Sequence, residues 1–226
     1  MAPAPESVTF GDLSVTTVVN SPPWYENCYL VRHIPTGSQL VIDPGGEPEK
    51  ILAAIKAGGG PVVAILLTHG HPDHLGAVHD LQQALNAPCQ AHQREEPIVR
   101  AASNWAGALM GMRLKGPQNC DYFDGEPVLE LAPFRCTTHH TPGHTPGGVC
   151  YVFDDFVFTG DTLFNQGVGR TDLPGGDGSA LSSSITRLLG SLSERQTLFS
   201  GHGPSWTVAE ARPWWRQASW MFQGED

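Results

Sequence analysis

Charged side chains are scarce in this chain, and those present are mainly acidic. Asp, Glu, Lys and Arg make up 16% of the 226 residues, the net charge is −10, and no cluster of Lys or Arg occurs. A protein whose main partner is a nucleic acid or an anionic membrane needs a basic patch. We therefore expect a protein that binds neither nucleic acid nor a membrane.

Long apolar runs and an export signal are also missing. The segment MAPAPESVTFGD contains no basic stretch followed by an apolar one. No later run reaches the ~18 apolar residues that a membrane-spanning helix requires. The five cysteines are widely spread and include no CxxC pair, which argues against a disulfide framework or a cysteine zinc knuckle. These features together predict a cytoplasmic protein.

Glycine and proline, in contrast, are abundant, with 26 and 19 residues. This composition favours many short elements joined by tight turns over long helices. The length is within the range of a large single domain. Because no linker is visible, we expect residues 1–226 to form a single domain.

Hydrophobic periodicity predicts short strands and amphipathic helices. Strands are expected over residues 14–19, 28–31, 39–43, 62–67, 128–131, 134–139, 149–153, 156–159 and 197–200, and helices over 47–57, 75–85, 95–112 and 181–192. A last helix is expected within 209–223, beginning at Pro213, because a residue before proline disfavours helical backbone. The run VVAILL at 62–67 has no polar alternation, which is typical of a strand covered on both faces.

The segment THGHPDHLG, residues 68–76, places three histidines and an aspartate between that buried strand and the next helix. Imidazole nitrogen and carboxylate oxygen are common metal ligands. His69 and His71 can converge on one ion, whereas Asp73 and His74 can face an adjacent ion. The alternative is a set of solvated surface histidines that cap the following helix.

Three further candidate donors each follow a predicted strand. His144 lies between two Pro/Gly turns in TPGHTPGG, Asp161 follows an apolar strand in FTGDTLF, and His202 follows the last strand in FSGHGP. Loops that leave neighbouring strands of a layered sheet can meet at one edge. We therefore expect these residues to join the histidine turn in a metal site.

These motifs, in this order from Asn27 to His202, resemble those of the metallo-β-lactamase superfamily. The resemblance implies an α+β fold, a four-layer αββα sandwich with a metal site at one edge. It also implies that Asp43, in VIDPGG, supports the histidine turn by contacting the metal ligands without binding the metal itself. Asp43 also suits a purely local role at the start of the turn at Pro44.

Carried over by position, the family pattern assigns two divalent metal ions to the chain. One ion is assigned to His69, His71 and His144, the other to Asp73, His74 and His202, and Asp161 bridges them. Asp73 and Asp161 are then the expected catalytic residues. Zinc is the expected metal, with iron or manganese as alternatives, because the same ligands accept all three. Such a pair of ions polarises a carbonyl group and acidifies a shared water molecule.

Within the superfamily, the stretch GDTLFNQGVGRTDLPGGD at 160–177 resembles glyoxalase II and its short bacterial relatives. The resemblance implies a small-molecule thioester substrate, an S-acylglutathione such as S-D-lactoylglutathione. A thioester suits the site because its thiolate leaves without a strong general acid. Full-length glyoxalase II grips glutathione with a C-terminal helical domain, whereas this sequence resembles the shorter, single-domain form, so the thiol carrier is left open.

Two alternatives remain open. Persulfide dioxygenase, a relative that also carries a GRTD segment, would bind a single ferrous ion through His69, His144 and Asp161. A non-enzymatic metal-binding protein is less consistent with the sequence, because one structural ion needs only four ligands. The pattern excludes the cysteine-containing β-lactamases, which have a thiolate at the position of Asp161, and the flavodiiron proteins, which have a carboxylate at the position of His71.

Other residues carry weaker predictions. Arg170 in GRTDL is expected to brace its loop, with substrate orientation as the alternative. Trp24, Tyr25 and Phe164 are candidates for the walls of a pocket, with core or rim positions as the alternative. The remaining histidines are expected to be structural or surface residues. The sequence assigns neither substrate-binding residues nor an oligomeric state.

Overall fold

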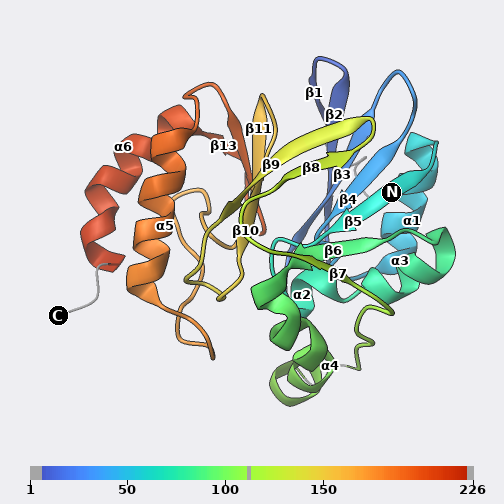
Figure 1. Ribbon diagram of the computed structural model, residues 1–226, viewed down its shortest axis with the longest axis horizontal. Coiled ribbons are helices and arrows are strands. Elements are labelled where there is room, and N and C mark those ends of the chain that lie inside the picture. The colour runs from blue at the N-terminus through green and yellow to red at the C-terminus, as the bar shows by residue number, and fades with distance from the viewer. Residues whose placement is uncertain (1–6, 111–112, 223–226) are drawn as a thin grey trace.

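The computed structural model describes residues 7–110 and 113–222. Within these residues the chain forms two β-sheets packed face to face, and helices cover both outer faces (Figure 1). Helices α1 (Pro48–Gly58) and α3 (Val78–Leu85) cover the first sheet, and α5 (Gly178–Ser191) and α6 (Val208–Ala218) cover the second. The predicted α+β fold, a four-layer αββα sandwich, is confirmed.

In the described part of the chain, the first sheet has seven strands in the order β1-β2-β3-β4-β5-β6-β7. The strands are β1 (Ser7–Phe10), β2 (Leu13–Val19), β3 (Asn27–His33), β4 (Gln39–Ile42), β5 (Val62–Leu66), β6 (Cys89–His92) and β7 (Asp121–Phe123). Pairing is antiparallel from β1 to β4 and parallel from β4 to β7. The parallel part requires crossovers, which α1, α3, and η1 (Gln93–Glu95) with α4 (Glu96–Met110) provide.

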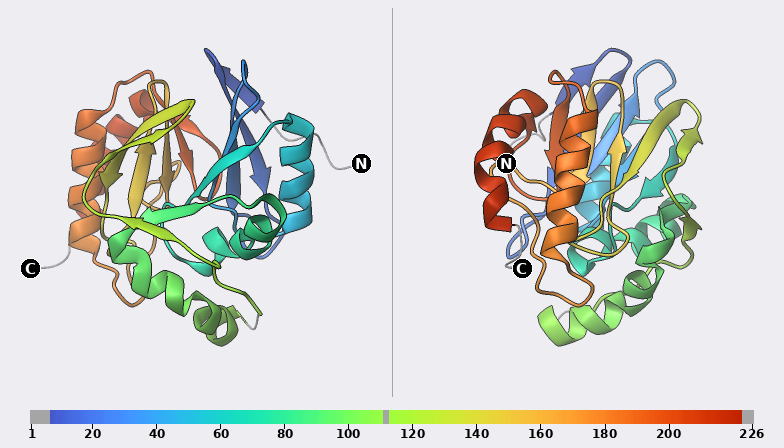
Figure 2. Two further views of the ribbon diagram at one scale, coloured as in Figure 1. Left: turned by 45° about the vertical axis from the view of Figure 1, so that its right-hand side comes forward. Right: turned by 60° about the vertical axis from the view of Figure 1, so that its left-hand side comes forward.

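The second sheet, within the same described residues, has six strands in the order β13-β12-β11-β10-β9-β8. The strands are β8 (Val128–Leu131), β9 (Phe134–His140), β10 (Val149–Val152), β11 (Phe156–Gly160), β12 (Thr197–Ser200) and β13 (Trp206–Thr207). The pairing of β11 with β12 is parallel, with α5 as the crossover, and the other pairs are antiparallel. Helix α4 lies at the same end of the molecule as α2 (Pro72–Leu75), which Figure 1 labels, and the further views show the same end with α4 projecting from it (Figure 2).

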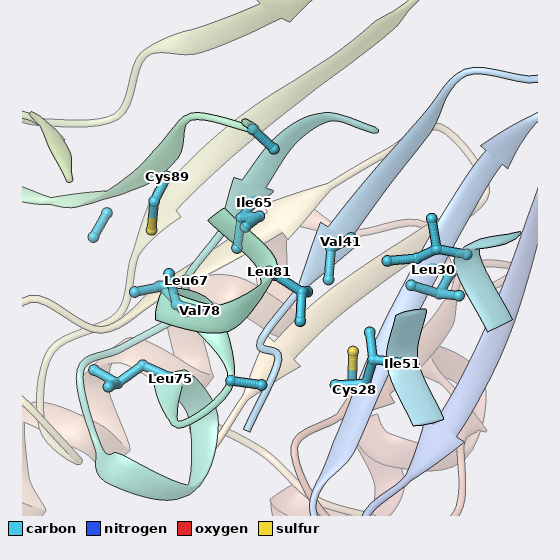
Figure 3. Close-up of a cluster of buried hydrophobic side chains, with 14 of the residues drawn as sticks. Cys28, Leu30, Val41, Ile51, Ile65, Leu67, Leu75, Val78, Leu81 and Cys89 are labelled. Atoms are coloured by element: carbon cyan, nitrogen blue, oxygen red, sulfur yellow. The ribbon is translucent and has the colours of Figure 1, made fainter. Parts of the chain in front are cut away.

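The strand β5 is covered on both faces, as its continuous apolar sequence predicts. Ile65 and Leu67 belong to a core between the first sheet and its helices, which also includes Ile51 of α1 and Leu81 of α3 (Figure 3). Leu66, which points to the opposite face, belongs to the core between the two sheets. A buried strand therefore leads directly into the histidine turn and fixes where that turn begins.

Two further cores complete the layering. Aromatic side chains dominate the core between the sheets, where Phe158 lies 5.0 Å from Tyr29 and 5.7 Å from Phe199 between ring centroids. The third core joins the second sheet to its helices and includes Ile185 of α5 and Trp215 of α6. Burial of these apolar faces, at about 25 cal/mol per Å², holds the two sheets in fixed relation.

The predicted helix over residues 75–85 is wrong in one respect, because the chain forms two helices there. Helix α2 (Pro72–Leu75) ends before Gly76, and α3 begins at Val78. A Cβ atom on Gly76 would lie 2.2 Å from the main-chain oxygen of Gly45. The turn therefore packs directly against the neighbouring loop, and this tertiary contact separates α2 from α3.

The predicted start of the last helix at Pro213 is also wrong. Helix α6 begins at Val208, where the side chain of Thr207 accepts from the Glu210 N–H and the Glu210 carboxylate accepts from the Thr207 N–H. This capping box fixes the start of the helix, and Pro213 is tolerated inside it. The short helix η2 (Ser219–Phe222) follows.

The strands β1, β6, β7 and β13 were not predicted, because they are short and β6 has the weakly apolar sequence CQAH. Within 7–110 and 113–222, no helix has both the length and the apolar character needed to cross a bilayer. That residues 1–226 form one domain stays a prediction.

Candidate metal centre

The seven candidate donors come from loops of both sheets and lie together at one edge of the sandwich. They are His69 and His71 after β5, Asp73 and His74 in α2, His144 between β9 and β10, Asp161 after β11, and His202 after β12. The four histidines His69, His71, His74 and His144 are buried, at 5% exposure or less. The folded chain thus brings together donors separated by more than a hundred positions.

Three of these histidines form what we call the three-histidine group: His69, His71 and His144. Nδ1 of His71 lies 2.9 Å from Nε2 of His144, which lies 3.2 Å from Nε2 of His69. The three ligand atoms are all within 4.8 Å of one another. Their convergence from two different loops matches the spacing of ligands around one ion.

Asp73, His74 and His202 form a second group, which we call the mixed group. Oδ2 of Asp73 lies 3.4 Å from Nε2 of His202 and 3.9 Å from Nε2 of His74. These ligand atoms also lie within 4.8 Å of one another. The mixed group is the more open of the two, because the side chain of His202 is 26% exposed, whereas that of His144 is 6% exposed.

Asp161 lies between the two groups. Its Oδ1 is 3.2 Å from Nε2 of His74, and its Oδ2 is 3.5 Å from Nε2 of His144 and 3.7 Å from Nε2 of His202. One carboxylate therefore faces nitrogen atoms of both groups. This is the placement that a ligand shared by two neighbouring ions requires.

Main-chain carbonyls fix the protonation pattern of two histidines. Nδ1 of His144 lies 2.7 Å from the carbonyl oxygen of Arg170, and Nδ1 of His202 lies 3.0 Å from that of Trp24. A carbonyl oxygen can only accept, so both Nδ1 atoms carry the proton and donate it. In this tautomer the lone pair belongs to Nε2, which faces the site as a metal ligand must.

Asp43 and Thr68 have the same effect on two more histidines. The Asp43 carboxylate accepts from the Thr68 N–H (2.7 Å), the Thr68 hydroxyl (2.6 Å) and Nδ1 of His74 (3.0 Å). Because the Thr68 hydroxyl donates to Asp43, its oxygen accepts from Nδ1 of His69 at 3.1 Å. Both histidines therefore turn Nε2 towards the site, where His69 presents a lone pair and His74 presents one once its second proton is displaced.

The resulting arrangement fits a cation. Nε2 of His69 and Nε2 of His144 are both acceptors and lie 3.2 Å apart, so they repel unless a positive species lies between them. Among the described residues, His74 Nε2 and Asp161 Oδ1 are buried without a hydrogen-bond partner of good geometry. Histidine nitrogen and aspartate oxygen suit divalent ions such as zinc, iron and manganese.

The pKa values of the site histidines also favour a bound cation. Burial, together with the neighbouring His144, lowers the pKa of His71 to about 3, and burial lowers the pKa of His69 well below its usual value. Burial also opposes protonation of His74, but the carboxylates of Asp161 and Asp73 outweigh it and raise the pKa of His74. A proton on His74 thus balances the carboxylates, and a metal ion would displace it.

Two buried side chains that the sequence did not single out hold the ligand loops. The carboxylate of Glu95 accepts from the N–H groups of Gly70 and Gly147, both at 2.7 Å. The side-chain amide of Asn27 donates to the carbonyls of Ser200 (3.0 Å) and Gly203 (2.8 Å), on either side of His202. Neither contact has a local sequence signal, because the partners are main-chain atoms distant in the chain.

Other predicted residues lie around the site or away from it. The side chain of Arg170 pairs with Asp172 at the surface, and only its carbonyl contacts a donor. The ring of Phe164 lies 5.7 Å from His202, and that of Trp105, which was not predicted, lies 5.8 Å from His71. Tyr25 is 59% exposed. Away from the donors, His92 stacks on His140.

Comparison with known proteins identifies the family. The family model of the metallo-beta-lactamase superfamily matches residues 21–202, so the chain belongs to this superfamily. It is 41% identical over 172 residues to the probable metallo-hydrolase YqgX of Bacillus subtilis, covering 75% of this chain and 82% of that protein. It is 32% identical over 197 residues to the hydroxyacylglutathione hydrolase GloC of Haemophilus influenzae, covering 83% and 90%.

Solved structures give the same fold. The chain resembles TTHA1623 in a di-iron-bound form, with a TM-score of 0.77, 40% identity, and coverage of 87% of this chain and 96% of that chain. It also resembles the BLEG-1 B3 metallo-beta-lactamase, with a TM-score of 0.81, 33% identity, and coverage of 88% and 96%. These relatives place the chain among metallo-hydrolases, and the names of GloC and BLEG-1 indicate different activities within that group.

Proposed function

We propose that this protein is a metal-dependent hydrolase of small thioesters, with an S-acylglutathione such as S-D-lactoylglutathione as the substrate and two divalent metal ions per chain. The observation that carries the proposal is the position of Asp161 between two groups of histidines whose Nε2 lone pairs face inward. The similarity to GloC, named as a hydroxyacylglutathione hydrolase, supports the substrate. We further propose that the protein acts in the cytoplasm.

The ligand assignment follows the two groups. The three-histidine group would hold one ion, the mixed group would hold the other, and Asp161 would be shared. Zinc is the metal we favour, with iron and manganese as alternatives. The di-iron form of TTHA1623 shows that a relative with 40% identity accepts iron.

Two ions bound in this way would polarise the thioester carbonyl and lower the pKa of a water molecule towards neutrality. Asp161 and Asp73, as the catalytic residues, would orient that water and receive its proton at their carboxylate oxygens. Asp43, Thr68 and the carbonyl of Arg170 keep the histidines in the tautomer that binds metal. The thiolate leaves without a strong general acid.

Substrate would approach from the side of the mixed group, which is the more exposed. Phe164 beside His202 and Trp105 beside His71 provide apolar surfaces at either side of the donors. Such surfaces suit the acyl chain and the thiol carrier, and they exclude water from the reacting bond.

The test combines metal analysis with three assays on one preparation. We expect close to two metal ions per chain and oxygen-independent hydrolysis of S-D-lactoylglutathione. Asp161→Asn should reduce turnover at least about 100-fold, whereas Asp154→Asn, a matched change at the exposed turn before β11, should leave it unchanged. A folded Asp161→Asn variant with full turnover would contradict the shared-ligand role.

The other assays decide between functions within the superfamily. One iron per chain with oxygen uptake on glutathione persulfide would transfer the function to persulfide dioxygenase. Hydrolysis of a chromogenic β-lactam at a rate far above thioester hydrolysis would transfer it to the activity named for BLEG-1. Either outcome would overturn the thioester proposal.

A further inference from the structure

Glu95 is a buried carboxylate that joins the two loops of the three-histidine group. The residue is fully buried at the end of η1. Its Oε2 accepts from the N–H of Gly70, which lies between His69 and His71, and its Oε1 accepts from the N–H of Gly147, in the loop of His144. Both distances are 2.7 Å, so each oxygen accepts from a main-chain N–H.

The close packing around Glu95 is a second, independent observation. A Cβ atom on Gly147 would lie 2.6 Å from the main-chain nitrogen of Glu95 and 2.9 Å from its Oε1. A Cβ atom on Gly70 would lie 3.1 Å from Oε2 of Glu95. The His144 loop therefore has no room for any side chain where it meets Glu95, and both loops contact the carboxylate itself.

The two hydrogen bonds of Glu95 connect a loop of the first sheet with a loop of the second sheet, next to the candidate metal-binding histidines. Gly70 follows β5 of the first sheet, whereas Gly147 precedes β10 of the second. A buried carboxylate is tolerated only when hydrogen bonds replace its water, and a neutral apolar residue here would leave two buried N–H groups without an acceptor. Glu95 therefore links the two loops that carry His71 and His144, whose Nδ1 and Nε2 atoms lie 2.9 Å apart.

We propose that Glu95 is a positioning residue, which holds His69 and His71 against His144 so that these three histidines bind one metal ion tightly, and which does not act on the mixed group. This inference rests on the metal binding within the proposed function. It does not depend on the substrate. Contacts that orient metal ligands typically contribute about 10- to 100-fold to metal affinity.

The test is Glu95→Gln, which keeps the size of the side chain but replaces one acceptor oxygen by a donor. The amide NH₂ then faces a main-chain N–H, so one of the two loops is released. Glu96→Gln is the matched control, because Glu96 is the adjacent acidic residue and its carboxylate pairs with Arg100 at the surface. Glu95→Asp keeps the charge but is too short to reach both loops.

The readout is Co²⁺ binding to metal-free protein, followed by visible absorption and by the NMR signals of the exchangeable ring N–H protons of the ligands. His69→Asn and His202→Asn variants identify which signals belong to which group. For Glu95→Gln we expect about 10- to 100-fold weaker binding of the ion at the three-histidine group. Binding at the mixed group and its N–H signals should stay as in the unmodified protein, and Glu96→Gln should change neither.

The outcomes separate a positioning role from a general structural one. Equal weakening of both ions, or no change at either, would overturn the proposal. Failure of both Glu95 variants to fold with metal present, while Glu96→Gln folds, would also overturn it, since Glu95 would then be a structural residue. Two tightly bound ions without thioester turnover in the unmodified protein would refute the proposed function and leave this inference standing.

Discussion

Asp43→Asn exchanges a carboxylate for an amide of nearly the same shape at a buried position behind His74. Asp43 has a left-handed backbone, with φ of 48°, and Asn tolerates this conformation as well as Asp does. The substitution therefore changes hydrogen bonding with little change in backbone energy. What it removes is the acceptor at 3.0 Å from His74 Nδ1.

The consequence can be followed atom by atom. The Asn oxygen can still accept from the Thr68 N–H, which places the NH₂ group where Oδ2 received the Thr68 hydroxyl and His74 Nδ1. Facing a donor, His74 must move its proton from Nδ1 to Nε2, and that nitrogen can no longer bind a metal ion. We expect a 10- to 100-fold loss of affinity at the mixed group, or about 1.4–2.7 kcal/mol.

The metal-free protein should also lose stability. A hydrogen bond to a charged group contributes about 1.5–3 kcal/mol, so the free energy of unfolding should fall by about that amount. Competition with a chromophoric chelator measures the affinity of each ion, and urea unfolding of metal-free protein measures the stability. Asp80→Asn, on the exposed side of α3, is the matched control. If Asp43→Asn binds both ions as tightly as the unmodified protein, Asp43 does not set the tautomer of His74.

Three further predictions follow from other contacts. Asn27→Asp replaces the two amide donors near His202 by acceptors, so a chelator competition should show a loss of about 10- to 100-fold at the mixed group only; unchanged affinity there refutes the role of Asn27. Burial lowers the pKa of His92 from 6.5 to about 4, and the neighbouring His140 adds to this shift. As the pH decreases from 6.5 to 4, His92 becomes protonated in the unfolded chain before it does so in the folded protein. The free energy of unfolding should therefore fall over this pH range. Urea unfolding at several pH values measures how steeply the free energy of unfolding depends on pH. His92→Asn should reduce this slope between pH 6.5 and 4, by an amount below the upper limit of about 1.4 kcal/mol per pH unit for one group. An unchanged slope would contradict the lowered pKa of His92. Gly45→Ala places a Cβ atom 1.6 Å from a main-chain oxygen of α2 and should reduce the free energy of unfolding by about 3 kcal/mol or more. Gly190→Ala, inside α5 with open space around it, should not reduce it and should raise it by up to about 1 kcal/mol.

The position of the candidate donors could be predicted because each follows a strand of recognisable pattern. The run VVAILL located β5, and the apolar segments before Asp161 and His202 located β11 and β12. Loops that leave adjacent strands at the same edge must lie close together. Sequence order and strand ends therefore carried most of the information on the site. The four-layer fold was predicted from the resemblance to the metallo-β-lactamase superfamily, because periodicity alone gives the elements and not their layering.

The orientation of His144 and His202 could not be predicted, because their partners are main-chain atoms. His144 and His202 donate to the carbonyls of Arg170 and Trp24, and every residue has a carbonyl. Glu95 and Glu96 are adjacent acidic residues in QREE. Only the packing of distant loops makes one a buried carboxylate and the other a surface partner of Arg100.

The same reasoning explains why the start of α6 was misjudged. A proline disfavours helical backbone in the residue before it, and that local preference predicts a start at Pro213. The capping box at Thr207 and the burial of Trp215 against the second sheet outweigh it. Where the two conflict, tertiary packing determines the element boundary and local preference does not.

Two tyrosines show how the sandwich itself assembles the site. The hydroxyl of Tyr29, from the first sheet, donates to the carbonyl of Ser200 at the end of β12 (2.6 Å), and the hydroxyl of Tyr151, from the second sheet, donates to the carbonyl of Leu67 beyond β5 (2.7 Å). Each sheet thus anchors the strand end from which the other sheet's ligand loop departs. The donors meet only when the aromatic core between the sheets is packed, so an ion held by all of them would bind the folded state in preference to the unfolded chain. Such binding would add to the free energy of unfolding in proportion to the logarithm of the metal concentration, once that concentration is well above Kd.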